Sequence, residues 1–175
     1  MTGMPDKTNL PLLKVQNLSK FFGKHIGCHD INFELSPGEV IGIVGESGSG
    51  KSTLLNCIAG KTNPTNGAVY FNSSDGYIDL CMSDEALLRK IARTQTGFVT
   101  QNSRDGLRMG ISAGGNIGER LMANGMRNYG QIRKIALEWL ETVEIDPARI
   151  DDLPETFSGG MQQRLQIAAN LVTEP

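Results

Sequence analysis

The stretch of residues 45–52, with the sequence GESGSGKS, constrains the fold of this chain more than any other feature. It fits the pattern G-x-x-x-x-G-K-[ST], which lies between a buried strand and the first turn of a helix. The flanks agree, because residues 40–44 (VIGIV) have the composition of a buried strand and residues 52–59 favour a helix. A plain Gly/Ser-rich turn would explain the glycines, but it would not require Lys51 and Ser52 at these positions. We therefore predict a loop that binds phosphate groups.

The chemistry of such a loop assigns expected roles to its residues. A glycine-rich turn at a helix N-terminus directs several backbone N–H groups toward one point, and the helix dipole adds partial positive charge there. Lys51 would reach the terminal phosphates of a nucleotide, and the Ser52 hydroxyl would ligate a phosphate-bound Mg²⁺. The predicted nucleotide-binding residues of the loop are Gly45, Glu46, Ser47, Gly48, Ser49, Gly50, Lys51, Ser52 and Thr53.

Composition argues against several classes of protein. With 175 residues the chain fits one domain, and its net charge of −2 and pI near 5.7 provide no general electrostatic attraction for nucleic acid. No apolar run approaches the roughly 18 residues that span a bilayer, and residues 1–10 lack a signal-peptide core. Cys28, Cys57 and Cys81 lie far apart in the sequence and are expected to be reduced thiols. We therefore predict a soluble cytoplasmic protein without a nucleic-acid partner.

Short strands dominate the predicted structure up to residue 101. Besides the strand before the phosphate loop, apolar runs bounded by turn residues predict strands at residues 12–18, 31–35, 68–71 and 97–101. A helix is expected to follow the capping residues Ser83, Asp84 and Glu85. These elements predict a mixed α/β core over about residues 12–101.

Helical spacing replaces the strand pattern from residue 102 onward. One apolar face comprises Ile132, Ile135, Ala136, Trp139, Leu140 and Val143. On that face Trp139 is expected to be a packing residue. The pattern returns in a last helix that begins just after Gly160. We therefore predict a helical subdomain over about residues 102–172, within a single domain.

A second motif, FSGGMQQR at residues 157–164, opens this last helix. Ser158 followed by two glycines at a helix N-terminus offers a hydroxyl and backbone donors, which together form a second anion cradle. An ordinary serine N-cap would have the same appearance. The motif alone does not separate the two interpretations, but it lies about a hundred residues after a phosphate loop.

The two motifs together resemble the ATP-binding cassette (ABC) ATPases. The resemblance implies a P-loop NTPase core with an antiparallel β subdomain and an inserted helical subdomain. It implies that the signature residues Ser158, Gly159, Gly160 and Met161 close on the γ-phosphate of ATP held by a second cassette. The expected cofactors are ATP and Mg²⁺, and the expected assembly is a head-to-tail homodimer.

Two further site residues follow from the same resemblance. Gln101 matches the glutamine that reaches Mg²⁺ and the attacking water and senses a docked partner protein, so we expect it to be catalytic together with Lys51. Phe22, followed by Gly23, lies where the family keeps an aromatic residue that stacks on adenine. Phe21 is the alternative for this position.

Three segments of the helical part carry a narrower resemblance. Residues 105–107 (DGL), 112–122 (SAGGNIGERLM) and 149–154 (RIDDLP) are similar to the ATP-binding subunits of bacterial phosphonate carbon-phosphorus lyase systems. This similarity extends from about Leu12 to Pro175 and implies a soluble phosphonate-processing enzyme complex as partner. The alternative is an importer ATPase of the peptide, nickel or phosphonate type, docked on permease subunits at the inner face of the membrane.

The family pattern continues beyond the last residue of this sequence. By resemblance, an acidic Mg²⁺ ligand, the catalytic glutamate and a switch histidine would follow Pro175, together with further strands. We therefore expect an incomplete cassette that lacks the C-terminal strands and hydrolyses ATP very slowly. A nucleotide-binding module without turnover is a third possible function.

Overall fold

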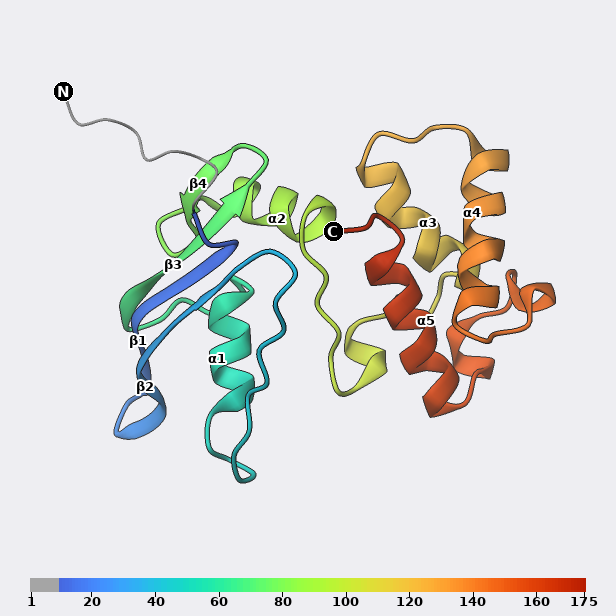
Figure 1. The fold of residues 1–175 in the computed structure, drawn as a ribbon. Helices are drawn as coiled ribbons and strands as arrows, with labels where there is room; N and C mark the ends of the chain where they lie inside the picture. The colour runs from blue at the N-terminus through green and yellow to red at the C-terminus, as the bar shows by residue number, and fades with distance from the viewer. Residues whose placement is uncertain (1–9) are drawn as a thin grey trace. The chain divides into compact units, whose positions relative to one another are not determined.

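The computed structural model describes residues 10–175, which belong to two compact units that divide between Leu88 and Arg89 (Figure 1). The N-terminal stretch for which no signal peptide is predicted therefore lies almost entirely outside the described residues. Among the described residues, no helix combines the length and apolarity that crossing a bilayer requires.

The first unit contains an antiparallel sheet with the strand order β2-β1-β3-β4. Its elements are β1 (Leu13–Phe22), β2 (His25–Leu35), α1 (Lys51–Ile58), β3 (Asn66–Ser73) and β4 (Gly76–Asp79). The strands predicted at residues 12–18, 31–35 and 68–71 are confirmed as parts of β1, β2 and β3, each of which is longer than expected. Strand β4 was not predicted, because only four residues follow the turn. The antiparallel β subdomain is thus present.

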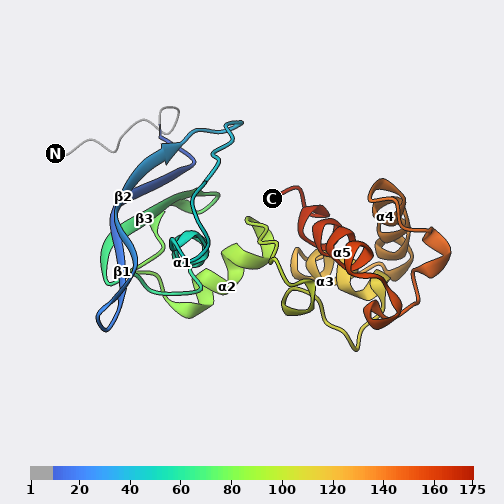
Figure 2. The ribbon, with the colours of Figure 1, turned by 90° about the horizontal axis from the view of Figure 1, so that it is seen from below.

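Helix α1 packs against β1 and β2 on one face of the sheet (Figure 2). Val15 and Leu18 of β1 and Val69 of β3 are buried, as are Leu54 and Cys57 of α1. Successive residues of a strand point to opposite faces of the sheet, so the residues next in sequence to these buried ones point to the other face. This layering places the N-terminus of α1, and with it the phosphate loop, near the beginning of β2.

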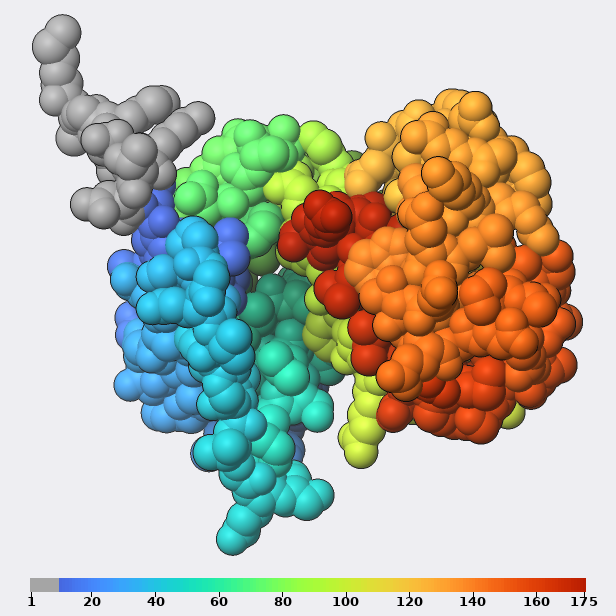
Figure 3. Space-filling model, turned by 45° about the vertical axis from the view of Figure 1, so that its right-hand side comes forward, coloured from blue at the N-terminus to red at the C-terminus, as the bar shows by residue number. Residues whose placement is uncertain are grey.

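The strand predicted at residues 40–44 is wrong. These residues form no strand, and the side chains of Val40 and Val44 are 95% and 92% exposed. Figure 3 shows this part of the chain, coloured cyan to teal, on the surface of the first unit. The physical reason is that a strand requires hydrogen-bonded neighbours. The four described strands pair with one another, and none pairs with residues 40–44.

The strand predicted at residues 97–101 is also wrong. The segment carries no strand assignment, and Val99 is 48% exposed. Its backbone groups bind helix side chains in place of a neighbouring strand, for example where Phe98 N donates to Asn170 Oδ1 over 3.0 Å.

The remaining elements are helices. They are α2 (Glu85–Thr94), α3 (Ala113–Ala123), α4 (Tyr129–Thr142) and α5 (Gly159–Leu171), with short 3₁₀ helices η2 (Ser103–Asp105), η3 (Pro147–Arg149) and η4 (Pro154–Thr156). Asp84 caps α2 as predicted, because its Oδ1 accepts from Leu87 N over 2.7 Å.

A single apolar cluster holds α3, α4 and α5 together in the second unit. The predicted face of α4 is confirmed, since Ile132, Ala136 and Leu140 are buried in the cluster and Trp139 packs against it. The cluster comprises Leu107, Ala113, Ile117, Leu121, Ile132, Ala136, Leu140, Ile145, Ile150, Phe157, Leu165, Ala168, Ala169 and Val172. The helical character predicted for this half of the chain is thus present.

Candidate functional site

Close contact between two backbones shapes the phosphate loop. Gly50 is the N-cap of α1 and adopts a left-handed conformation with φ of 92°. A Cβ at this position would overlap the carbonyl oxygen of Gly27 in β2. Gly50 must therefore be glycine both for its backbone conformation and for its contact with β2.

Lys51 lies at the mouth of the same loop. Its Nζ donates to the carbonyl oxygens of Gly45, over 2.8 Å, and of Glu46. The helix begins at Lys51, and Leu54 N donates to Gly50 O over 2.9 Å. Because the N–H groups of a first helical turn have no acceptor within the helix, they are directed toward the loop. The loop thus combines an ammonium group with backbone donors, an arrangement that suits a polyphosphate.

A cleft of about 450 Å³ borders the loop. It is lined by Ile26, Gly27, Cys28, His29, Ile31, Ile43, Val44, Gly45, Gly48, Ser49, Gly50, Lys51 and Leu54. The loop thus provides one wall of the cleft and β2 another. Ser52 is exposed on the first turn of α1.

Gly27 is a site residue that the sequence analysis missed. A Cβ at Gly27 would lie 2.8 Å from Thr53 Cγ2 and 2.9 Å from Phe22 Cε2, so these side chains meet over this glycine. The strand predicted at residues 31–35 did not reach Gly27, whereas β2 begins at His25 and places this glycine inside a strand. A glycine in that position often marks close approach by another part of the chain. The structure thereby brings Phe22 and Thr53 to the same end of α1 as the phosphate loop.

The two candidate aromatic residues have different surroundings. The ring of Phe21 packs edge-on against His29 with a centroid separation of 5.8 Å. The side chain of Phe22 is 52% exposed, with the ammonium of Lys20 lying 5.2 Å from its ring centroid. The exposed ring of Phe22 has the better access for stacking on a ligand.

The cysteines are free thiols, as predicted. Burial raises the pKa of the Cys57 thiol in α1 to about 11, which keeps it protonated near neutral pH. Its interpretation as a small packing residue agrees with this environment.

The second motif forms the N-terminus of α5. Ser158 is its N-cap, and Ser158 Oγ accepts from Met161 N over 3.3 Å. Gly159 and Gly160 are exposed, and no described atom lies within 4 Å of the position that a Cβ would take on either. Packing within the described residues therefore does not require glycine at these two positions.

Side chains from the preceding loop hold this N-terminus in place. Arg149 forms an ion pair with Asp152, with 2.7 Å between Nε and Oδ2, and its guanidinium carbon lies 4.3 Å from the ring centroid of Phe157. Gln162, which is buried, donates from Nε2 to the carbonyl oxygens of Pro154, over 2.9 Å, and Phe157, over 3.2 Å. Both stretches carry the family resemblance in the sequence, but their role in orienting Ser158 depends on these tertiary contacts.

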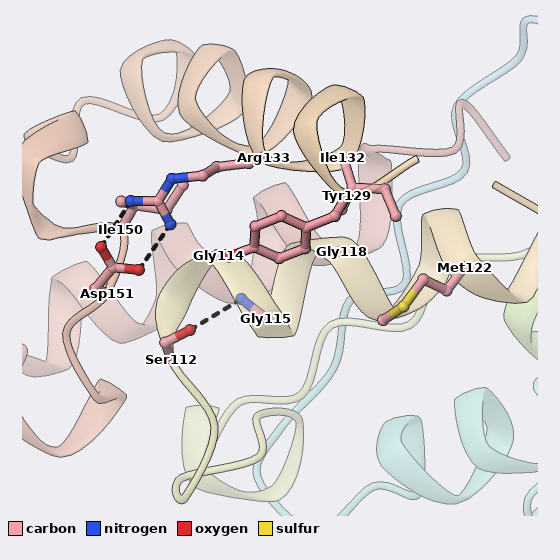
Figure 4. Close-up of a pocket in the computed structure, with 10 residues that line it drawn as sticks. All are labelled: Ser112, Gly114, Gly115, Gly118, Met122, Tyr129, Ile132, Arg133, Ile150 and Asp151. Carbon is pink, nitrogen blue, oxygen red and sulfur yellow. Dashed lines mark hydrogen bonds and ion pairs between the residues drawn. The ribbon is translucent and has the colours of Figure 1, made fainter. Parts of the chain in front are cut away.

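A small cavity of about 170 Å³ lies between α3 and α4 (Figure 4). The ion pair between Arg133 and Asp151 borders it, with distances of 2.7 and 2.6 Å, and holds the pKa of Asp151 below its usual value. None of the predicted site residues lines this cavity. Its lining residues are Ser112, Gly114, Gly115, Gly118, Met122, Tyr129, Ile132, Arg133, Ile150 and Asp151.

Gln101 is exposed in the second unit, where its carbonyl oxygen accepts from Gln163 Nε2 over 3.4 Å. Lys51 and Ser52 belong to the first unit. The approach of Gln101 to the phosphate loop therefore stays a prediction.

Comparison with known proteins identifies the family. The family described as ABC transporter matches residues 28–175. The chain belongs to this family. ABC cassettes are ATPases, so the resemblance found in the two motifs is confirmed together with the fold class.

Individual ABC relatives cover nearly all of the chain. The phosphonates utilization ATP-binding protein PhnK of Escherichia coli (strain K12) is 57% identical over 167 residues, which are 95% of this chain and 65% of that protein. The methionine import ATP-binding protein MetN of Brucella abortus (strain 2308) is 31% identical, over 98% of this chain and 44% of that protein. The chain thus spans less than two thirds of these relatives.

A solved structure shows the same fold. The ATP-binding cassette MJ0796, in a dimeric post-hydrolysis state bound to ADP and Pi, superimposes with a TM-score of 0.83 at 34% sequence identity. The match covers 93% of this chain and 70% of that one.

We expect Gly50→Ala to destabilise the first unit by about 2–5 kcal/mol, because the new methyl group adds overlap with Gly27 to the strain of a left-handed backbone. Gly48→Ala is the matched control, since Gly48 has φ of 82° but no described atom within 4 Å of a Cβ. That control should lose only about 1–2 kcal/mol. Urea denaturation followed by far-UV circular dichroism measures both, and equal losses would contradict the assigned contact.

Proposed function

We propose that this chain is the ATP-binding part of the ATPase subunit of a phosphonate carbon-phosphorus lyase system. It binds Mg-ATP, closes on a second copy of the cassette and acts on a soluble enzyme complex that processes phosphonates in the cytoplasm. The observation that supports this choice is the 57% identity to PhnK, against 31–34% for the importer ATPases MetN and DppD.

In this proposal about residues 12–101 provide the nucleotide site. The loop Gly45–Ser52 and Thr53 hold the phosphates, and Phe22 stacks on adenine. Lys51 contacts the terminal phosphates, while Ser52 and Gln101 ligate Mg²⁺ as oxygen donors, the ligand type that Mg²⁺ prefers. The positive ammonium of Lys51, the first-turn donors of α1 and the exposed ring of Phe22 fit such a ligand.

The helical part, about residues 102–172, provides the signature. Ser158, Gly159, Gly160 and Met161 contact the ATP of the second cassette. Open space around both glycines supports this assignment, because a close approach from outside the described residues explains why side chains are absent there. The relative MJ0796 is itself dimeric in its solved structure. The resulting site is composite, so closure requires two cassettes.

An importer ATPase is the second candidate function. The dipeptide transport ATP-binding protein DppD of Bacillus subtilis (strain 168) is 34% identical over 94% of this chain, and MetN is similar at 31%. In that case the helical part would dock on membrane permease subunits, and the protein would lie at the inner face of the membrane.

For the 175-residue chain we propose ATP binding with slow hydrolysis. The groups assigned to the reaction, the Lys51 ammonium and the Gln101 amide, stabilise charge and orient water, but neither is a general base. Loss of general base catalysis typically costs a factor of about 10²–10⁴. A phosphate-release assay at saturating Mg-ATP separates this proposal from that of an active ATPase.

Lys51→Ala should weaken ATP binding about 10- to 100-fold, because a hydrogen bond to a charged group contributes about 1.5–3 kcal/mol. Lys14→Ala is the matched control, since Lys14 pairs with Glu34 over 2.6 Å and neither residue lines the cleft at the phosphate loop. Isothermal titration calorimetry with ATP provides the measurement. An unchanged affinity in Lys51→Ala would refute the assignment of the phosphate loop.

Ser158→Arg should leave ATP affinity within about twofold while abolishing ATP-dependent dimerisation, because the arginine would occupy space needed for a partner's phosphates. Gln131→Arg, with the same change of charge on the exposed surface of α4, should dimerise normally. Sedimentation velocity with and without Mg-ATP tests the pair. Normal dimerisation of Ser158→Arg would contradict the composite site.

Copurification distinguishes the two candidate partners. Affinity purification of the tagged chain from cells grown on a phosphonate as the phosphorus source should recover soluble phosphonate-processing enzymes. Recovery of integral membrane subunits without those enzymes would favour the importer function and overturn the proposal.

A further inference from the structure

Three amide side chains follow one another along one face of α5. Gln163, Gln166 and Asn170 are spaced by three and four residues, which places them on the same side of a helix. Gln166 is fully buried and Asn170 is 9% exposed. Burying an amide costs free energy unless its donors and acceptors are paired. The hydrogen-bond partners of these three amides therefore indicate the role of this helix face.

All three amides bind the backbone of the segment that leads to Gln101. Asn170 Oδ1 accepts from Phe98 N over 3.0 Å. In the amide orientation that satisfies both of its ends, Gln166 accepts from Thr100 N over 3.0 Å and donates to Thr100 O over 3.2 Å. Gln163 Nε2 donates to Gln101 O over 3.4 Å. The helix face thus binds the backbone groups of Phe98, Thr100 and Gln101, which a neighbouring strand would otherwise pair.

Neighbouring residues support this attachment. Arg120 of α3 donates from NH1 to Asn170 Oδ1 over 3.0 Å and from NH2 to Thr96 O. A Cβ at Gly106 would overlap the amide of Gln166, so this glycine leaves the space that the amide occupies. Arg120 and Gly106 lie in the segments at residues 112–122 and 105–107, which carry the narrower family resemblance.

We propose that Gln166 and Asn170 are positioning residues that attach residues 96–101 to the signature helix. Gln163 lies five residues after Ser158, roughly 8 Å along the helix axis. Gln101 and Ser158 are therefore held on one rigid element, and a displacement of either one moves the other. The functional part of this inference rests on the proposed function, since that proposal assigns Gln101 to Mg²⁺ and water and Ser158 to the second ATP.

The attachment is tested first without nucleotide, by amide hydrogen exchange. Asn170→Leu should lower the protection of the Phe98 and Thr100 amides about tenfold or more, because the Phe98 N–H loses Asn170 Oδ1 and the Gln166 carbonyl oxygen loses its bond from Asn170 Nδ2. Asn116→Leu is the matched control, since Asn116 is an equally buried helical asparagine that binds residues 108–112. Asn170→Asp keeps the acceptor for the Phe98 N–H and should keep the protection of that amide.

Equal loss of protection in both leucine variants, or none in Asn170→Leu, would overturn the attachment. If Asn170→Leu does not fold, Asn170→Ala and Asn116→Ala provide the same comparison with a smaller change in shape. The fluorescence of Trp139, the single tryptophan, reports whether each variant is folded.

The functional part is tested by ATP affinity with and without Mg²⁺. Gln101→Ala and Asn170→Leu should each reduce the gain in affinity due to Mg²⁺ by about threefold to tenfold, the range of one hydrogen bond. The double variant should lose no more than either single variant, because both changes act on the same group. Asn116→Leu and Asn170→Asp should each retain the full gain in ATP affinity due to Mg²⁺.

The two proposals fail in different ways. If the unmodified chain does not bind ATP, the proposed function fails, and the exchange experiment still decides the attachment. If Gln101→Ala loses the Mg²⁺ gain while Asn170→Leu keeps it, or if the two losses add, the positioning role is overturned and the proposed function stands.

Discussion

The contact between the backbones at Gly27 and Gly50 is the constraint on which the first unit depends. It requires a glycine at position 50, where a Cβ would overlap the Gly27 carbonyl oxygen, while a Cβ at Gly27 would crowd the side chains of Thr53 and Phe22. The contact fixes the beginning of α1 against β2, and α1 packs on the same sheet with Leu54 and Cys57 buried. The phosphate loop is therefore fixed where it enters α1, although its residues are largely exposed.

In the second unit, polar contacts hold the exposed N-terminus of α5 in one orientation. Arg149 and Gln162 bind the loop before Ser158, and the amides of α5 bind the segment before Gln101. Both sets of contacts are polar and lie beside an apolar cluster that supplies most of the burial. The polar contacts set the orientation of α5 and the apolar cluster stabilises its packing, as expected for a helix whose function depends on both.

The two wrong strands lie before predicted site residues, one before the phosphate loop and the other ending at Gln101. Residues 40–44 and 97–101 have the apolar composition of buried strands, but composition cannot show which backbone groups will pair with them. The first of these segments has no strand neighbour among the described residues, and the second pairs with helix side chains. Gly27 and Gln166 were missed for a related reason, since their roles depend on atoms far away in the sequence.

Local physics explains what the sequence by itself determined: the glycine-rich turn that leads into α1, the serine cap of α5, the helical face of α4, three strands of the sheet and the family. Each depends on residues close together in the chain, whose spacing is visible in one dimension. Only the tertiary structure decided that Phe22, Gly27 and Thr53 meet, and that α5 carries the segment before Gln101. These features depend on close contacts and on the pairing of buried polar groups, which exist only after distant parts of the chain have come together.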